Sequence, residues 1–245
     1  MTSKDDKIEA MKKLLLLLVL GFISPLFTIG SAYAIGAYPS GSSGYDVSYP
    51  NCNARKPSGA FGIVGVTGGL NFSQNPCLPK ENGWFKGATL YLNSGYPGYL
   101  KALNYQNSPR TCQTTDLNCL AYNYGYNAGL YAVNYAKSLN VKSATWWLDV
   151  ETMNTWQSDT VQNRQSIQGE YDALSSNTID TIGAYSTTAQ WDQITGTWKP
   201  GWPSWGASTW RTAKQAATFC TGHEFTGGTT YLIQYTGKLD QDYAC

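Results

Sequence analysis

Charged side chains are scarce in this chain of 245 residues, of which Asp, Glu, Lys and Arg make up 13%. The two signs nearly cancel, because 17 basic residues face 16 acidic ones. No run or stripe of basic residues is present, and a protein that binds nucleic acid needs one to neutralise phosphates. The charge pattern therefore argues against nucleic acid as a partner.

Histidine occurs once, at position 223, and this scarcity argues against several kinds of site. His223 stands in no GxSxG context, so the sequence offers no Ser-His-Asp triad. The cysteine spacings match no common zinc pattern. No GxxxxGK[ST] phosphate loop is present, and GGLNFS after a predicted strand lacks the dinucleotide-binding pattern. We expect no metal site and no cofactor, and we expect His223 to be a loop residue.

The chain has one long apolar run and no second one. LLLLLVLGFISPLFTIG follows two lysines and leads into SAYA, which is the layout of a secretory signal peptide. Residues 1–34 are therefore predicted to be a cleaved signal. Met11 is an alternative start, because the ten residues before it carry three acids. Ser24 and Pro25 interrupt the run, so we expect no permanent membrane span, with an uncleaved N-terminal anchor as the alternative.

Beyond the predicted signal, residues 35–43 are rich in Gly, Ser and Pro and are predicted to be a linker. Residues 44–245 show no internal repeat and are predicted to be a single domain. The signal carries four lysines and three acids, so the remaining chain is neutral (+1 − 1 = 0). We expect a secreted, extracellular monomer, with association with a cell wall as a further option.

Six cysteines are present, and all of them follow the predicted signal. An even number of cysteines in a secreted chain indicates disulfides, and six cysteines allow 15 pairings. We expect sequence neighbours to pair, as Cys52–Cys77, Cys112–Cys119 and Cys220–Cys245.

Strand-like and helix-like segments alternate along the domain. Strands are predicted at 44–50, 61–69, 87–95, 144–151, 181–187, 202–209 and 229–237, and helices at 120–139, 160–177, 187–196 and 212–220. Such alternation predicts a mostly parallel sheet with helices outside, and the length fits a small (β/α) barrel. The fold class is therefore α/β, a single TIM-like barrel stapled by disulfides, in which the helical signal thins toward the C-terminus.

The stretch WWLDVET, from Trp146 to Thr152, carries two acids at the end of a predicted strand. Asp149 and Glu151 are two residues apart, so their side chains point to the same face of the strand. Like charges held so close perturb each other's ionisation. Neither acid has an obvious basic partner nearby in sequence, which favours a functional role over a polar strand end.

Chemistry in such barrels takes place at the carboxyl ends of the strands. Asp46 ends the first strand, Asp240 follows the last, and Tyr185 ends the fifth. We expect these side chains to meet Asp149 and Glu151 at one rim. The ordinary alternative is that strand ends and helix caps are simply polar, and we accept that interpretation for Asp116, Asp192 and Asp242.

Paired carboxyls are the catalytic groups of glycosidases, in which one acid protonates the leaving oxygen and the other stabilises or attacks the developing oxocarbenium centre. Tryptophan supports a sugar substrate, because its flat ring stacks on the C–H face of a pyranose and its N–H donates. The candidates are Trp147, Trp191, Trp202 and Trp205, although each could be a core residue. We expect Trp147 to face the helices.

The ordered motifs GYDVS, WWLDVE, IGAYST, WPSWGAS and LIQYTGKLDQD resemble glycoside hydrolase family 25, the Chalaropsis-type lysozymes. The resemblance implies a barrel of five β/α units followed mainly by strands. It implies cleavage of the β-1,4 bond after N-acetylmuramic acid, helped by the acetamido group of the substrate. On this likeness Glu151 is the proton donor and Asp149 its partner, Asp46 and Asp240 complete the catalytic acids, and the substrate-binding residues are Tyr185, Trp205 and Gln234.

The sequence departs from the family pattern near its end. Ile233 stands where tryptophan usually precedes Gln-Tyr, and Asp242 stands where the Asp-x-Asn tail usually has asparagine. A narrower likeness is to secreted bacterial proteins of the same barrel superfamily that share GYDVSYPxC, FGIVGVxGG and a DYAC ending. Two functions follow as hypotheses: a secreted glycosidase acting on peptidoglycan or a related N-acetylated glycan, or a non-catalytic barrel that binds glycan or the cell wall.

Overall fold

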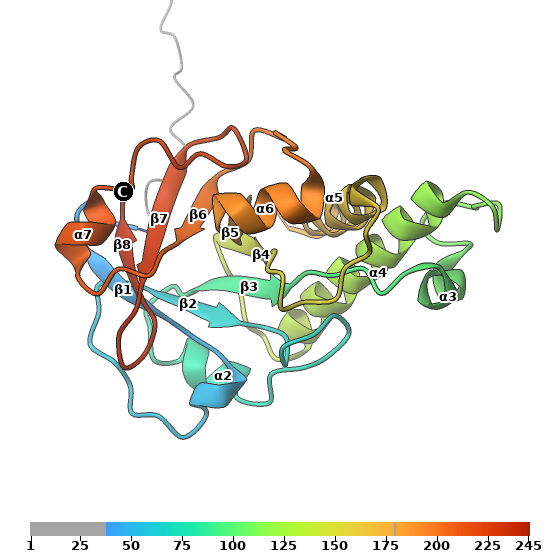
Figure 1. Ribbon diagram of the computed structural model, residues 1–245. Coiled ribbons are helices and arrows are strands. Elements are labelled where there is room, and N and C mark those ends of the chain that lie inside the picture. The colour runs from blue at the N-terminus through green and yellow to red at the C-terminus, as the bar shows by residue number, and fades with distance from the viewer. Residues whose placement is uncertain (1–37, 179) are drawn as a thin grey trace, which may run out of the picture. The chain divides into compact units, whose positions relative to one another are not determined.

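A computed structural model of the chain describes residues 38–178 and 180–245 (Figure 1). The predicted signal peptide, residues 1–34, lies outside the described residues, and so does the start of the predicted linker. The rest of that linker lies against the barrel, since Tyr38 is buried and its hydroxyl donates to Thr89 Oγ1 at 2.6 Å. No helix within the described part of the chain is long and apolar enough to cross a membrane.

Eight strands close into a barrel, as the sequence predicted for the fold class. The first seven strands pair in parallel with their sequence neighbours, namely β1 (Ser43–Val47), β2 (Gly62–Gly65), β3 (Thr89–Asn93), β4 (Thr145–Asp149), β5 (Thr181–Ser186), β6 (Ser204–Ala207) and β7 (Thr230–Tyr235). The eighth strand, β8 (Gln241–Ala244), runs antiparallel to both β7 and β1 and completes the barrel. β8 was not predicted from the sequence; it is four residues long and carries a buried acid, Asp242. A turn suffices to connect β7 to it because the two strands are antiparallel.

Two long helices cover one side of the sheet, α4 (Leu117–Ser138) and α5 (Thr160–Asn177), and they lie side by side in Figure 1. Glycines permit their close approach: a Cβ at Gly125 would lie 1.8 Å from the Ser166 carbonyl oxygen. Asp116 caps α4 by accepting from the Cys119 backbone N–H, as expected for an acid at a helix start. The remaining helical segments are shorter: α2 (Leu78–Asn82), α3 (Tyr99–Ala102), α6 (Thr188–Thr195), α7 (Ala213–Ala217) and the 3₁₀ turns η1 (Tyr49–Asn51) and η2 (Leu103–Tyr105).

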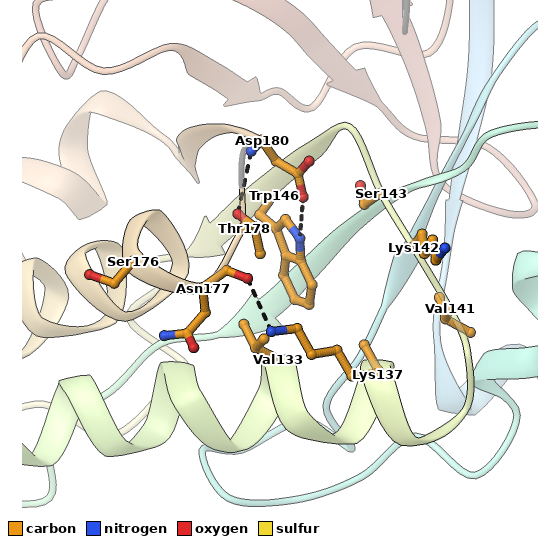
Figure 2. Close-up of a pocket in the computed structure, with 11 residues that line it drawn as sticks. Val133, Lys137, Val141, Lys142, Ser143, Trp146, Ser176, Asn177, Thr178 and Asp180 are labelled. Carbon is orange, nitrogen blue, oxygen red and sulfur yellow. Dashed lines mark hydrogen bonds between the residues drawn. The ribbon is translucent and has the colours of Figure 1, made fainter.

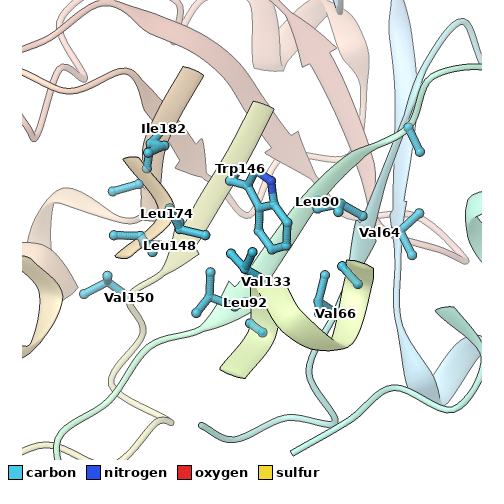
Figure 3. Close-up of a cluster of buried hydrophobic side chains, with 14 of the residues drawn as sticks. Val64, Val66, Leu90, Leu92, Val133, Trp146, Leu148, Val150, Leu174 and Ile182 are labelled. Carbon is cyan, nitrogen blue, oxygen red and sulfur yellow. The ribbon is translucent and has the colours of Figure 1, made fainter. Parts of the chain in front are cut away.

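Apolar side chains fill both faces of the sheet. Figure 3 shows the outer cluster, in which strand residues such as Leu90, Trp146 and Leu148 pack against Val133 of α4 and Leu174 of α5. The inner cluster lies inside the barrel and consists of Tyr38, Phe61, Ile63, Trp147, Tyr185, Trp205, Leu232 and Ala244. Burial of both faces explains why the strands are nearly continuous apolar runs.

Trp147 belongs to this inner cluster, so the expectation that it faces the helices is wrong. Side chains alternate along a strand with a period of two, which places Trp147 on the same face as Asp149 and leaves Trp146 to face the helices. Within the barrel, the Trp147 indole N–H donates to the Tyr38 hydroxyl at 2.8 Å.

The three predicted disulfides are confirmed. Cys52–Cys77, Cys112–Cys119 and Cys220–Cys245 have Cα–Cα distances of 5.5, 5.6 and 5.4 Å, within the ordinary range for a bridge. Cys220–Cys245 joins the residue after β8 to the segment that follows α7. The closing strand is therefore tied covalently to the rest of the barrel.

Candidate active site

A cavity of about 310 Å³ opens at the carboxyl ends of the strands. Eight residues line it, contributed by six strands or the loops that follow them: Asp46, Tyr91, Asp149, Glu151, Tyr185, Trp205, Gln234 and Asp240. This set contains all seven residues that the sequence predicted as catalytic or substrate-binding. The barrel thus brings together groups separated by up to 194 positions in the chain, from Asp46 to Asp240.

Asp149 and Glu151 stand in different surroundings although they are two residues apart. Asp149 is only 5% exposed, and its Oδ2 accepts a hydrogen bond from the Asn93 side-chain amide on β3. Glu151 lies just beyond β4, half-buried, and Gln190 of α6 hydrogen-bonds to its carboxyl. The Gln190 Oε1 accepts from the Thr152 backbone N–H at 2.6 Å, so its amide nitrogen is the end left for Glu151.

The two carboxyls of this pair retain a proton more strongly than isolated acids do. Burial raises the pKa of Asp149 well above its usual value, and the charge of Glu151 raises it further. Burial also raises the pKa of Glu151, although hydrogen bonds with Asp149 and Gln190 lower it. Because the two groups interact, their titration belongs to the pair, and one proton is shared where lone carboxyls would both be ionised.

Two consecutive hydrogen bonds connect Tyr185 on β5 to Asp46 on β1 through Gln234 on β7. The Tyr185 hydroxyl donates to Gln234 Oε1 at 2.8 Å, and Gln234 Nε2 donates to Asp46 Oδ2 at 3.0 Å. Burial, and then the charge of Asp240, raise the pKa of Asp46 to about 7. Asp240 is exposed at the rim, and partial burial of its carboxyl raises its pKa as well.

Asp242 is not the ordinary polar residue that the sequence analysis took it to be. It lies on β8 with 0% exposure, and its Oδ1 accepts from the Trp205 indole N–H at 2.8 Å. Its carboxyl is within hydrogen-bonding reach of Asp46. The error follows from the missed strand, because a residue after the last predicted strand was expected to be in a solvated loop.

No described lysine or arginine is among the groups that shift the pKa of Asp46, Asp149, Glu151, Asp240 or Asp242. Acids gathered without a cation repel one another, and a structural role would ordinarily pair them. Within residues 38–178 and 180–245, no group of three His, Cys, Asp or Glu residues is arranged to hold a metal ion. The arrangement suits proton transfer and the stabilisation of positive charge.

Three residues of the site were not predicted, namely Tyr91, Asn93 and Gln190. Asn93 ends β3 directly beside Asp149, the last residue of β4, and Tyr91 lies two positions earlier on the same face. The strand-end rule that selected the acids would have selected Asn93 had it been applied to amides. Gln190 gave no such signal, because it reaches Glu151 from the first turn of a helix.

Of the four candidate tryptophans, Trp205 alone lines the cavity. Its ring centroid is 4.4 Å from that of Tyr185, and it is 2% exposed. Trp202 stacks on Tyr171 at 4.1 Å, and Trp191 packs against Trp198, so these two are core residues. His223 lies in a loop, as the sequence predicted.

A second hollow, of about 520 Å³, lies near the start of β4 and β5, beside the ends of α4 and α5 (Figure 2). Its one described carboxyl, Asp180, accepts from the Trp146 indole N–H at 3.1 Å. Lys137 donates to the Asn177 carbonyl at 3.1 Å across the hollow. The described residues here thus provide no acid pair, and the cavity at the opposite strand ends is the candidate active site.

The protein is an eight-stranded α/β barrel whose cavity at the carboxyl ends of the strands is lined by acids. Comparison with known proteins shows which barrel proteins it is similar to. The model of the family described as "Lysozyme-like protein 1" matches residues 116–225, which include Asp149, Glu151, Tyr185 and Trp205. A curated relative, "Probable GH family 25 lysozyme 5" of Dictyostelium discoideum, is 29% identical over 115 residues. That match covers 45% of this chain and spans half the length of the relative.

Solved structures extend the likeness over most of the described chain. A bacterial lysozyme from Streptomyces coelicolor superposes with a TM-score of 0.51 and 16% identity, covering 84% of this chain and 92% of that one. A muramidase from Trichobolus zukalii gives 0.51 and 14%, covering 83% and 93%. At these identities the likeness shows the fold. The chain therefore has the barrel fold of these lysozyme and muramidase structures, and part of its sequence is similar to a family 25 lysozyme, in line with the resemblance noted in the sequence.

Proposed function

We propose that this protein is a glycoside hydrolase that cleaves the β-1,4 bonds of peptidoglycan or a related N-acetylated glycan. One observation carries the proposal: four acids from three parts of the chain, Asp46, Asp149, Glu151 and Asp240, line one open cavity, and no described lysine or arginine lines it with them. The barrel shared with lysozymes and a muramidase supports the choice of substrate. The disulfides support secretion, since such bridges persist in oxidising compartments.

Glu151 is the proposed proton donor. It is the more exposed acid of the pair, so it can reach the glycosidic oxygen, and its raised pKa keeps a proton available. As the C–O bond breaks, the proton passes to the leaving oxygen and Glu151 becomes ionised. It then takes a proton from the attacking water and returns to its starting state.

Asp149 is the proposed partner of Glu151, and its carboxylate stabilises the positive charge that develops on the sugar in the transition state. Burial favours the protonated form of Asp149, but an oxocarbenium-like centre next to it favours the carboxylate. The Asn93 amide fixes the orientation of that carboxylate. In this position Asp149 stabilises the transition state and orients the acetamido oxygen of the substrate for attack on the anomeric carbon. The shared proton of the pair must therefore reside on Glu151 before the C–O bond breaks, and it passes from there to the leaving oxygen.

The decisive experiment measures the clearing of purified cell walls together with the chemistry of the products. We expect the wild-type protein to release soluble fragments with new reducing ends, and Glu151→Gln to release few. Glu224→Gln is the matched control, because Glu224 is an exposed glutamate outside the cavity. Wall binding without new reducing ends would instead identify a non-catalytic glycan-binding barrel.

A further inference from the structure

Asp242 is a fully buried carboxyl that the proposed reaction does not use directly. On β8 it is the register partner of Gln234 on β7 and of Gly44 on β1, which places it beneath the cavity floor beside Asp46. Asp242 itself does not line the cavity. Its side chain reaches the site at two cavity residues: it accepts from the Trp205 indole N–H, and the Asp46 carboxyl is within hydrogen-bonding reach.

The two oxygens of Asp242 have different surroundings. Oδ1 accepts the Trp205 indole N–H, whereas Oδ2 is buried and receives no hydrogen bond. A buried carboxylate oxygen with no donor is costly, but the same oxygen bearing a proton becomes a donor that needs an acceptor. The Asp46 carboxyl is within reach to accept it.

No described lysine or arginine is among the groups that face Asp242. Its neighbours are Asp46 on β1, Asp240 before β8, Tyr38 of the N-terminal segment and Tyr185 on β5. The hydrogen bond from the Trp205 indole is the one described contact that lowers the pKa of Asp242. Burial raises the pKa of Asp242 well above its usual value, and the charge of Asp46 raises it further.

The Asp46 carboxyl already accepts one hydrogen bond, from the Gln234 side-chain amide, and the orientation of that amide is fixed. Gln234 Nε2 points at Asp46 Oδ2, and it cannot be reversed without breaking the bond that Tyr185 donates to Gln234 Oε1. Resting on the proposed function, we propose that Asp242 is a positioning residue that stays protonated and donates to Asp46, holding that carboxylate ionised and aimed into the cavity.

The test is a titration of carboxyl groups by carbon NMR, which reads protonation whether or not the protein is an active enzyme. In the wild-type chain, Asp242 should keep its proton through the pH range in which Asp46 loses its own. Asp242→Leu keeps the branched shape of the side chain but has no donor, so the Asp46 midpoint should rise by about one to two pH units. Asp242→Asn replaces the O–H donor with an amide and should leave that midpoint nearly unchanged.

The same variants separate this role from simple packing in an activity assay. We expect the acidic limb of kcat/KM to move to higher pH in Asp242→Leu, and to stay near its wild-type position in Asp242→Asn. If Asp242 titrates below Asp46, or if both variants leave the Asp46 midpoint unmoved, the inference is overturned. Should the wild-type protein cleave no glycan, the proposed function fails while the NMR titration still decides the role of Asp242. Should a variant not fold, the wild-type titration decides it alone.

Discussion

Asn93 and Asp149 are register partners at the ends of β3 and β4, and the Asn93 amide donates to the Asp149 carboxyl. Thr67 fixes the other end of this amide, because its hydroxyl donates to Asn93 Oδ1 at 2.7 Å. The amide therefore cannot turn away. It holds Asp149 in one orientation and favours its ionised form, which is the form that the proposed mechanism requires.

Asn93→Ala should lower kcat/KM by about 10- to 100-fold, because a hydrogen bond to a charged group contributes about 1.5–3 kcal/mol. The loss should appear in kcat more than in KM, since the bond stabilises the Asp149 carboxylate most strongly in the transition state, where positive charge develops beside it. Steady-state kinetics on soluble glycan fragments measure both. Asn53→Ala, at an exposed position, is the control. An unaltered kcat in Asn93→Ala would show that this contact does not support catalysis.

Glu170 of α5 should make the stability of the fold depend on pH. The side chain is fully buried, with Asn71 donating to Oε1 at 2.7 Å, and burial raises its pKa to about 8. An acid whose pKa is raised by folding is stabilising while protonated. Its contribution is fully present below the unfolded pKa of about 4.3 and is lost as the pH rises to about 8.

Glu170→Gln should remove this part of the dependence, so the melting temperature of the variant should vary less than that of the wild-type between about pH 5 and about pH 8. Thermal melts in a series of buffers measure it. The buried acids of the cavity contribute a slope of the same sign in both proteins. Equal slopes in the wild-type and the variant would contradict the account of Glu170, and Glu224→Gln should leave the slope unchanged.

The disulfides should differ in their contribution to stability according to the loop that each closes. In the chain-entropy model, a separation of 25 residues, as in Cys220–Cys245, corresponds to about 3.5 kcal/mol, and one of 7, as in Cys112–Cys119, to about 2.4 kcal/mol. Replacing both cysteines of a bridge with serine should therefore lower the free energy of unfolding more for Cys220–Cys245. Denaturant unfolding of the two double variants checks the order, and the reverse order would contradict it.

Much of the site could be predicted from the sequence because it follows from two strong regularities. Parallel strands of a barrel deliver their last residues to one mouth, which placed Asp46, Asp149 and Tyr185 together. The helix at 160–177 has the predicted bounds, since its buried Ile167 and Leu174 are seven residues apart and follow the helical period, although Val161 is 44% exposed. Sequence neighbours among the cysteines also paired as expected.

The failures have equally definite causes. β8 is four residues long and closes the barrel in the antiparallel sense, so neither its length nor the strand–helix alternation signalled it. Missing the strand led to the wrong interpretation of Asp242. Trp147 was assigned to the wrong face of its strand by an error in the two-residue period. Gln190 reaches the site through tertiary packing alone, which no local pattern encodes.

The most direct test of the central claim measures the reducing ends that the wild-type protein and Glu151→Gln release from purified peptidoglycan. Glutamine keeps the shape of the side chain but cannot donate the proton, so hydrolysis should fall by about 10²- to 10⁴-fold while wall binding survives. Asp149→Asn should lose nearly as much, and both variants should be at least as stable as the wild-type, because each relieves repulsion between acids. A wild-type protein that binds walls, releases no reducing ends and is indifferent to Glu151→Gln would contradict the account.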